Sequence, residues 1–168
     1  MLAMTYNQWR KRKGIMDKKG YSMDYLWESL KYFKPSEFRY PDEMIKRFYF
    51  LQRLDEFREF VGKPIIIHSD YRPNDRGQHG LGRAVDIHIV GMNIIDQFLC
   101  AEKSGLFSGI GVYPCWNNPG LHLDVRNLGE NEYPARWGCW TPTGDSKKNI
   151  YVPLDSAFFK RIVMEDER

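Results

Sequence analysis

Two short segments, 84–89 and 121–126, constrain the fold of this chain more than any other part of the sequence. In both, apolar residues alternate with ionisable ones, which is the two-residue period of a β-strand. Each strand therefore has one apolar face for a core and one face of acidic and imidazole groups, which indicates a shared polar cleft. The ionisable residues are Asp86 and His88 in the first segment, and His122, Asp124 and Arg126 in the second.

Helical and strand patterns alternate along the rest of the chain. The pattern over 41–61 repeats apolar residues at helical spacing, and Gly62-Lys63-Pro64 ends it. Short strands with segregated helices are typical of the α+β class, and we expect a small antiparallel sheet with helices packed on one side. The other predicted helices are 22–30, 93–103 and 154–164, and the other predicted strands are 65–67 and 109–113.

The length of 168 residues suits one domain with a sizeable core. We expect residues 1–34 to form an N-terminal accessory region and residues 35–168 to form the main domain. No run approaches the ~20 apolar residues that span a bilayer, so no membrane partner is expected. The start, Met1 to Thr5, lacks the apolar core of a secretory signal, so we expect synthesis in the cytoplasm without a signal peptide.

The formal net charge is +3, and basic residues cluster at 10–13 and 18–19. This cluster is either a solvated arm or a segment attracted to an anionic surface, such as a bacterial wall or nucleic acid. Nucleic-acid binding is not expected, because no base-reading motif accompanies the cluster. Nothing in the sequence predicts an oligomeric state.

The three cysteines are Cys100, Cys115 and Cys139, an odd number without a C-x-x-C pair. This spacing argues against a disulfide framework and against a thiolate zinc site. We expect buried free thiols.

Imidazole and carboxylate groups are the ligands that hydrolytic zinc takes, usually three of them with one position left for water. His79, Asp86 and His122 can supply such a set, and Gly80 and Gly82 allow a tight turn between the first two.

Four ordered motifs resemble the M15 family of zinc peptidases, the D-Ala-D-Ala carboxypeptidase and phage endopeptidase group that shares its fold with the hedgehog signalling domain. They are 66–72 (IIHSDYR), 78–87 (QHGLGRAVDI), 109–114 (GIGVYP) and 121–126 (LHLDVR), and the resemblance covers about residues 35–130. It implies a hedgehog-like fold with His79, Asp86 and His122 as zinc ligands. It also implies that Arg72 binds a carboxylate or carbonyl of the substrate, for which a forked guanidinium is suited. We expect Tyr71, beside it, to bind substrate as well.

The chain departs from the family pattern in the loop and at the general base. Gly77 replaces the usual Ser two residues before the first ligand, and Asp70 replaces a Gly. Family members carry Glu, Asp or His two or three residues before the last ligand, whereas this chain has Pro119 and Gly120, which cannot accept a proton.

Asp124 is the first candidate for the catalytic base, because it shares a strand face with His122. The alternatives for Asp124 are to orient a ligand or to pair with Arg126. His88 is the second candidate, with a supporting role as its alternative, and His68 is expected to be structural.

The motifs together predict a zinc-dependent peptidase that hydrolyses peptidoglycan stem peptides, as a D,D-carboxypeptidase or an endopeptidase. A phage or prophage enzyme such as an endolysin would suit the compact chain, acting at the bacterial wall after lysis, after export or as a virion component. The alternative is a zinc-containing module that binds the wall, or has a structural role in a virion, without catalysis. Pro119 and Gly120 favour that alternative.

Overall fold

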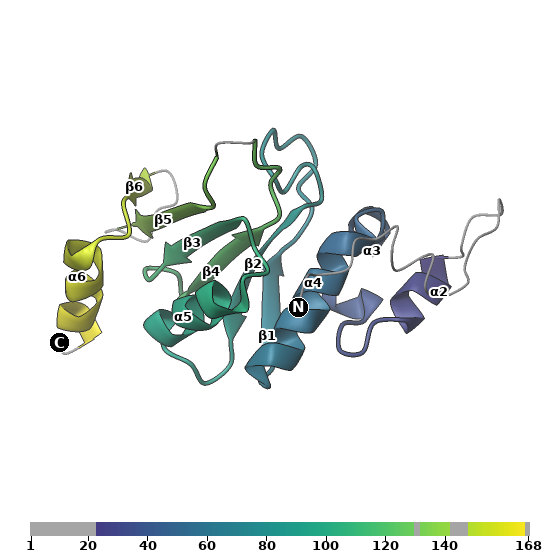
Figure 1. Ribbon diagram of the computed structural model, residues 1–168, viewed down its shortest axis with the longest axis horizontal. Helices are drawn as coiled ribbons and strands as arrows, with labels where there is room; N and C mark the ends of the chain where they lie inside the picture. Colours follow the sequence, from purple (N-terminus) through teal and green to yellow (C-terminus); the bar gives the residue numbers. More distant parts are fainter. Residues whose placement is uncertain (1–22, 130–131, 142–147, 167–168) are drawn as a thin grey trace.

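The computed structural model describes residues 23–129, 132–141 and 148–166, so the basic cluster at 10–19 lies outside the described residues (Figure 1). None of the helices in these ranges is long and apolar enough to cross a membrane. The described elements, in chain order, are α2 (Met23–Glu28), η1 (Pro35–Glu37), α3 (Pro41–Ile45), α4 (Phe48–Val61), β1 (Ile65–Ser69), β2 (Ala84–Ile89), α5 (Ile94–Ser104), β3 (Gly109–Tyr113), β4 (Gly120–Asp124), β5 (Ala135–Trp140), β6 (Ile150–Val152) and α6 (Ser156–Asp166).

The six strands form one sheet in the order β1-β2-β4-β3-β5-β6. The combination of helices and a sheet is confirmed, but the sheet is mixed and not antiparallel throughout, because β5 runs parallel to β3. Both Asp124 at the end of β4 and Ala135 at the start of β5 lie opposite Gly109. The chain therefore re-enters the sheet beside the start of β3 and follows its direction.

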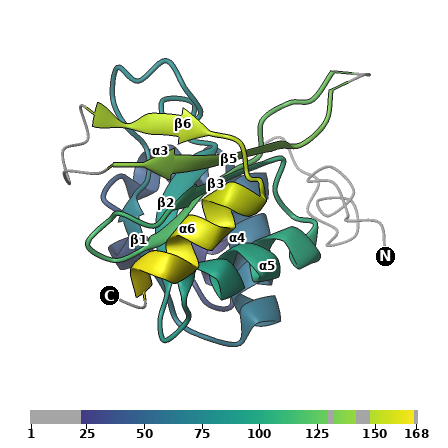
Figure 2. The same ribbon diagram turned by 90° about the vertical axis from the view of Figure 1, so that its left-hand side faces the viewer.

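The two faces of the sheet differ as the alternation predicts. The apolar face packs against α4, α5 and α6, which lie on the same side of the sheet in Figure 2. Strands β2, β4 and β3 contribute fully buried side chains to this core, among them Val85, Ile87, Leu121, Leu123, Ile110 and Val112. The opposite face is left for polar groups.

The helix predicted over 41–61 is two helices, α3 and α4, and the prediction of one continuous helix is wrong. The break falls at Arg47, whose backbone leaves helical geometry at φ −111° and ψ 47°. Its side chain extends away to donate from Nε to the Leu81 carbonyl at 2.9 Å. The predicted end of the helix is confirmed, because Gly62 adopts the left-handed conformation at φ 66°.

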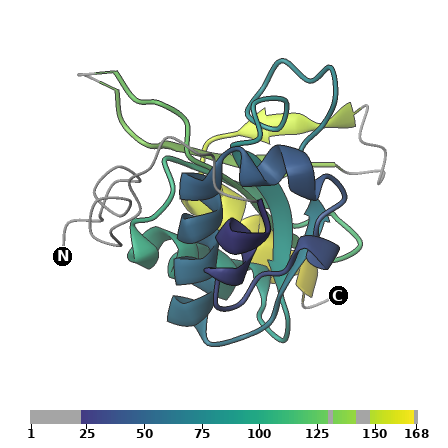
Figure 3. The ribbon, with the colours of Figure 1, turned by 90° about the vertical axis from the view of Figure 1, so that its right-hand side faces the viewer.

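The described part of the predicted accessory region, residues 23–34, packs into the same core as the rest of the chain. Figure 3 shows α2 (purple) on the side where α3 and α4 (blue) lie. Asp55 of α4 accepts backbone hydrogen bonds from this segment, which fixes the chain leaving α2 against α4. The donors are the amides of Lys31 at 2.9 Å, Tyr32 at 2.8 Å and Phe33 at 3.1 Å.

Two strands, β5 and β6, were not predicted from the sequence. Segment β5 mixes Arg, Gly and Trp without clear alternation, and β6 has only three residues. The strand predicted over 121–126 ends at Asp124. The three cysteines are free as expected, with Cys139 buried and Cys100 and Cys115 half-buried.

Candidate metal centre

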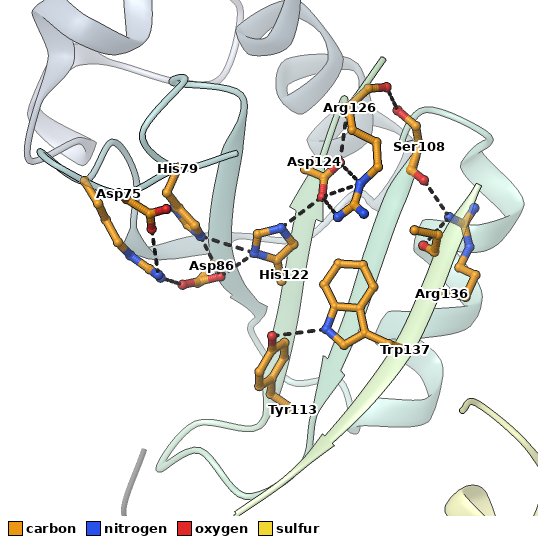
Figure 4. A network of polar contacts seen from close by, with 12 residues as sticks. Asp75, His79, Asp86, Ser108, Tyr113, His122, Asp124, Arg126, Arg136 and Trp137 are labelled. Atoms are coloured by element: carbon orange, nitrogen blue, oxygen red, sulfur yellow. Dashed lines mark hydrogen bonds and ion pairs between the residues drawn. The ribbon is translucent and has the colours of Figure 1, made fainter. Parts of the chain in front are cut away.

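Three side chains from separate parts of the chain meet on the polar face of the sheet (Figure 4). His79 comes from the loop between β1 and β2, while Asp86 and His122 lie opposite one another on β2 and β4. The Nε2 atom of His79 is 3.2 Å from Asp86 Oδ1 and 3.2 Å from His122 Nδ1. His122 Nδ1 is 3.0 Å from the same Asp86 oxygen. These three atoms form a nearly equilateral donor triangle.

The loop that carries His79 is held by its own backbone. The His79 carbonyl accepts hydrogen bonds from the amides of Arg72 at 3.3 Å and Gly82 at 3.0 Å. Gly82 adopts a left-handed φ of 64°, and at Gly80 a Cβ would collide with the Asp75 carbonyl. The glycines of the motif therefore bring the loop close enough for His79 to reach the strands.

Outer hydrogen bonds set the tautomer of each imidazole. His79 Nδ1 lies 2.6 Å from the Asp70 carbonyl, which can only accept, so Nδ1 donates and Nε2 keeps a lone pair in the neutral ring. His122 Nε2 lies 3.1 Å from Asp124 Oδ2, so Nε2 donates to the carboxylate and Nδ1 keeps a lone pair. Both lone pairs point into the donor triangle.

The donor triangle is close to the size that a metal ion requires. Ligand atoms about 2.0–2.1 Å from a tetrahedral ion lie roughly 3.3–3.4 Å apart. The observed separations of 3.0–3.2 Å are slightly shorter. Burial opposes ionisation of Asp86, but without a metal a protonated His122 or His79 can donate to the carboxylate, and these contacts hold the pKa of Asp86 well below its ordinary value. The buried group of His79, Asp86 and His122 could therefore hold a metal ion.

Asp124 lies behind His122, on the side away from the donor triangle. Its side chain is fully buried, and Arg126 binds it through Nε at 2.9 Å to Oδ1 and Nη2 at 2.5 Å to Oδ2. Burial alone would raise the pKa of Asp124. The hydrogen bonds from Arg126 and His122 outweigh this effect and hold the pKa well below its ordinary value. The contacts that the two alternatives for Asp124 require are thus both present, one with His122 and one with Arg126.

Two glycines of β3 leave space for side chains from the strands on either side of it, and the sequence did not reveal this role. A Cβ at Gly109 would collide with the Asp124 carboxylate, and a Cβ at Gly111 would collide with the Trp137 indole. The Trp137 ring lies 5.1 Å from the Arg126 guanidinium, and its Nε1 donates to Tyr113 at 3.2 Å. The repeated glycines of GIGVY were the only signal that side chains of neighbouring strands cross β3.

Arg72 binds the Asp86 carboxylate directly. Its Nη2 pairs with Asp86 Oδ2, the oxygen that does not face the imidazoles. Its Nε donates to Ser69 Oγ at 2.9 Å, and Nη1 lies 3.7 Å from Asp75 Oδ2. The two oxygens of Asp86 are therefore divided between the donor triangle and Arg72.

A cavity of about 930 Å³ opens over the donor triangle. All three triangle residues line it, together with Arg72 and His68. The remaining lining residues include Arg126, Trp137, Tyr113, Trp116, Asn149 and Tyr151. The size and the mixture of aromatic and polar groups are those of a ligand-binding site.

Three of the predicted site residues, Tyr71, His88 and Asp124, are not among the residues that line this cavity. Tyr71 lies edge-on to Tyr40 at 5.7 Å, beside a separate cavity of about 240 Å³. His88 contacts His68, with its Nδ1 2.6 Å from His68 Nε2. Burial, followed by the nearby His68, lowers the pKa of His88. His88 thus reaches the cavity only through His68, which was expected to be structural.

Comparisons with protein-family models, with curated proteins and with solved structures found no match to this chain. Function is therefore inferred from the donor triangle, from the cavity above it and from the residues that surround them.

Proposed function

We propose that this protein is a zinc-dependent peptidase that hydrolyses peptidoglycan stem peptides, with a fold of the hedgehog and D,D-peptidase type. One observation carries the proposal: two imidazole lone pairs and one carboxylate oxygen converge within 3.0–3.2 Å at the base of a large cavity. Three protein ligands leave a fourth position open, which is the arrangement of catalytic zinc, whereas structural sites close all four positions.

Zinc is the metal that this ligand set favours. Two neutral imidazoles and one carboxylate match the ligands of hydrolytic zinc sites, and the described ligand group contains no thiolate. When bound, zinc supplies Lewis acidity, which lowers the pKa of water toward about 7 and polarises a carbonyl.

The protein's own residues bind the substrate and keep the ligands in place. Arg72 points its guanidinium at the same carboxylate that faces the imidazoles, so a peptide carbonyl above the site lies within reach of its remaining N–H groups. Asp124, fixed by Arg126, keeps the His122 ring in the tautomer that a metal needs.

The proton is handled by His68 in this proposal. Asp124 is buried behind His122 and bound by Arg126, so in this proposal it does not take the proton. His68 lines the cavity, and His88 contacts its Nε2, so His88 contributes through His68. A positioned imidazole of this kind contributes about 10²–10⁴-fold to a rate.

Peptidoglycan is proposed as substrate because four ordered motifs resemble a family that acts on wall peptides. The proposal places the protein at the bacterial wall, as a phage or prophage enzyme such as an endolysin. The test is digestion of purified peptidoglycan by zinc-loaded protein, with and without a chelator, and with products identified by mass spectrometry. Chelator-sensitive products support the proposal, and they should vanish in Asp86→Ala but persist in Asp24→Ala, which changes an exposed acid outside the site.

The second candidate is a zinc-containing wall-binding or virion module without catalysis. It is favoured by Gly120, two residues before the last ligand, where a Cβ would collide with the Ile87 carbonyl, so an acidic side chain has no space there. Binding to peptidoglycan without any product, by folded and zinc-loaded protein, would select this candidate.

A further inference from the structure

Tyr113 brings a hydroxyl group to the polar face of the sheet, beside the donor triangle. It ends β3, two residues after Gly111, which lies opposite His122. Residues two apart in a strand share a face, and diagonal neighbours such as Tyr113 and His122 lie about 7–8 Å apart, within reach of an aromatic side chain. The ring is largely buried and forms part of the cavity wall. In Figure 4 its hydroxyl end points toward Asp86 and His122.

The neighbours of Tyr113 fix its ring and leave its proton available. Trp116 stacks on the ring with centroids 4.2 Å apart and planes at 16°. Trp137 Nε1 donates to the Tyr113 oxygen at 3.2 Å. An indole N–H can only donate, so this bond uses a lone pair of the oxygen and not the O–H proton. Within the described ranges of the chain, no acceptor takes that proton.

The two arginines that line the cavity do not occupy this position. Arg126 binds Asp124 and lies 5.1 Å from the Trp137 ring, and Figure 4 shows the indole between the guanidinium and Tyr113. Arg72 follows β1, whereas Tyr113 ends β3, and the strand order β1-β2-β4-β3 places the strands of the donor triangle between them. Arg72 and the Tyr113 hydroxyl are therefore two separate donors on opposite sides of the triangle.

The Tyr113 hydroxyl keeps its proton at neutral pH. Burial raises the pKa of Tyr113 above its ordinary value of about 10, and nearby ionisable groups, including the Asp86 carboxylate, raise it further against the bond from Trp137. A divalent ion held by Asp86 would offset the effect of that carboxylate, but the effect of burial, which is the largest cause, remains. Tyr113 is therefore suited to donate a hydrogen bond and not to act as a base.

A fixed donor at this place suits the chemistry proposed for the site. When water attacks a peptide carbonyl, the C=O π bond opens and its electron pair moves to the oxygen, which gains negative charge. We propose that Tyr113 is a catalytic residue that donates its O–H to the oxygen of the scissile carbonyl, and that Trp137 is a positioning residue. The hydrogen bond strengthens as the charge develops, and no proton leaves Tyr113. This inference rests on the proposed peptidase function and adds two residues to its site.

The experiment removes the hydroxyl and keeps the ring, as Tyr113→Phe. Mass spectrometry of peptidoglycan products identifies the bond that the zinc-loaded wild type cuts, and a synthetic peptide with that bond is the substrate for kinetics. One such donor contributes about 10²–10³-fold to kcat, and because Arg72 shares the task we expect a fall of at least about tenfold, with KM within about threefold. Tyr133→Phe, at an exposed tyrosine outside the cavity lining, should match the wild type.

Two binding measurements separate this role from a structural one. Zinc affinity of Tyr113→Phe, from competition with a chelating dye, should stay within about twofold of the wild type, because the hydroxyl holds no ligand of the triangle. A phosphinate analogue of the same peptide carries a tetrahedral anion in place of the scissile carbonyl. Its Kd, measured by calorimetry, should rise at least about tenfold in Tyr113→Phe.

The possible failures are distinguishable. A fall in kcat of less than about tenfold, in folded and zinc-loaded Tyr113→Phe, would overturn the role of Tyr113 while the peptidase function stands. A loss of zinc affinity as large as the loss of kcat would also overturn it, because Tyr113 would then support the ligands. No product from the folded, zinc-loaded wild type would overturn the peptidase function and this inference together.

A double-mutant cycle tests the positioning role of Trp137. Trp137→Phe removes the N–H that binds the Tyr113 oxygen but keeps an aromatic ring. If Trp137 acts through Tyr113, this change should lower kcat at least about threefold in the wild type but less than about twofold in Tyr113→Phe. Equal losses in both backgrounds would show that Trp137 acts independently, for example through its contact with Arg126, and would refute the positioning role.

Discussion

Gly109 of β3 lies opposite Asp124 of β4, and the Asp124 carboxylate fills the space that a Cβ at position 109 would need. The absence of a side chain on one strand thus allows a buried acid on the next to lie across it and reach His122 at 3.1 Å. The geometry of the candidate metal centre depends in this way on a residue that touches none of its three side chains.

The first prediction is that Gly109→Ala weakens both the fold and the metal site. The new methyl group must displace the carboxylate from Arg126 and His122, and overpacking of this kind costs about 1–3 kcal/mol. Urea unfolding of the metal-free protein and competition with a chelating dye measure the two effects. Gly129→Ala, where an added Cβ meets only ordinary contacts, should stay within about 0.5 kcal/mol of the wild type.

The second prediction concerns the role of Asp124. Asp124→Asn keeps the size of the side chain but removes the charge that holds the His122 tautomer. We expect zinc affinity to fall about 10–100-fold, as for other outer partners of histidine ligands. Activity at saturating zinc should recover most of the loss. Unchanged zinc affinity with activity abolished would instead assign Asp124 to the proton transfer.

The third prediction is that the metal-free protein loses stability at acid pH, in part because Asp124 becomes protonated. Burial opposes ionisation of Asp124, but the hydrogen bonds of Arg126 and His122 hold its pKa below that of an unfolded aspartate, which is about 3.9. Its ionised form therefore stabilises the fold above about pH 4, and this contribution is lost as the pH falls toward the lower folded value. Urea unfolding between pH 3 and 7 should show that the free energy of unfolding falls less steeply toward acid pH in Asp124→Asn than in the wild type. Asp24→Asn should follow the wild type.

Much of the site could be predicted from the sequence because its residues follow local rules. The period of two in 84–89 and 121–126 places Asp86 and His122 on polar faces, and the glycines after His79 predict a tight loop. Each of these features depends on residues close together in the chain.

The features of the fold and of the site that could not be predicted depend on contacts between residues far apart in the sequence. The Trp137 ring crosses Gly111 from β5, a strand that has no clear alternation and pairs with β3 only after a long connection. The split between α3 and α4 reflects the reach of Arg47 to the Leu81 carbonyl, 34 residues away. His68 enters the cavity because the pairing of β1 with β2 shifts between Ile67 and Ser69, which the sequence pattern does not reveal.

The fourth prediction separates His68 from the metal ligands. In the proposed mechanism His68 moves the proton, so His68→Gln should lower kcat at least about 100-fold, the lower range for a lost general base. Zinc affinity should remain within about twofold of the wild type, because His68 is not part of the donor triangle. Steady-state kinetics and dye competition on the same protein give both numbers. Tyr71→Phe, at a residue outside the cavity lining, should change kcat less than about threefold, since it removes no group that the mechanism uses. A normal kcat in His68→Gln would leave the proton to another group and return His88 to consideration.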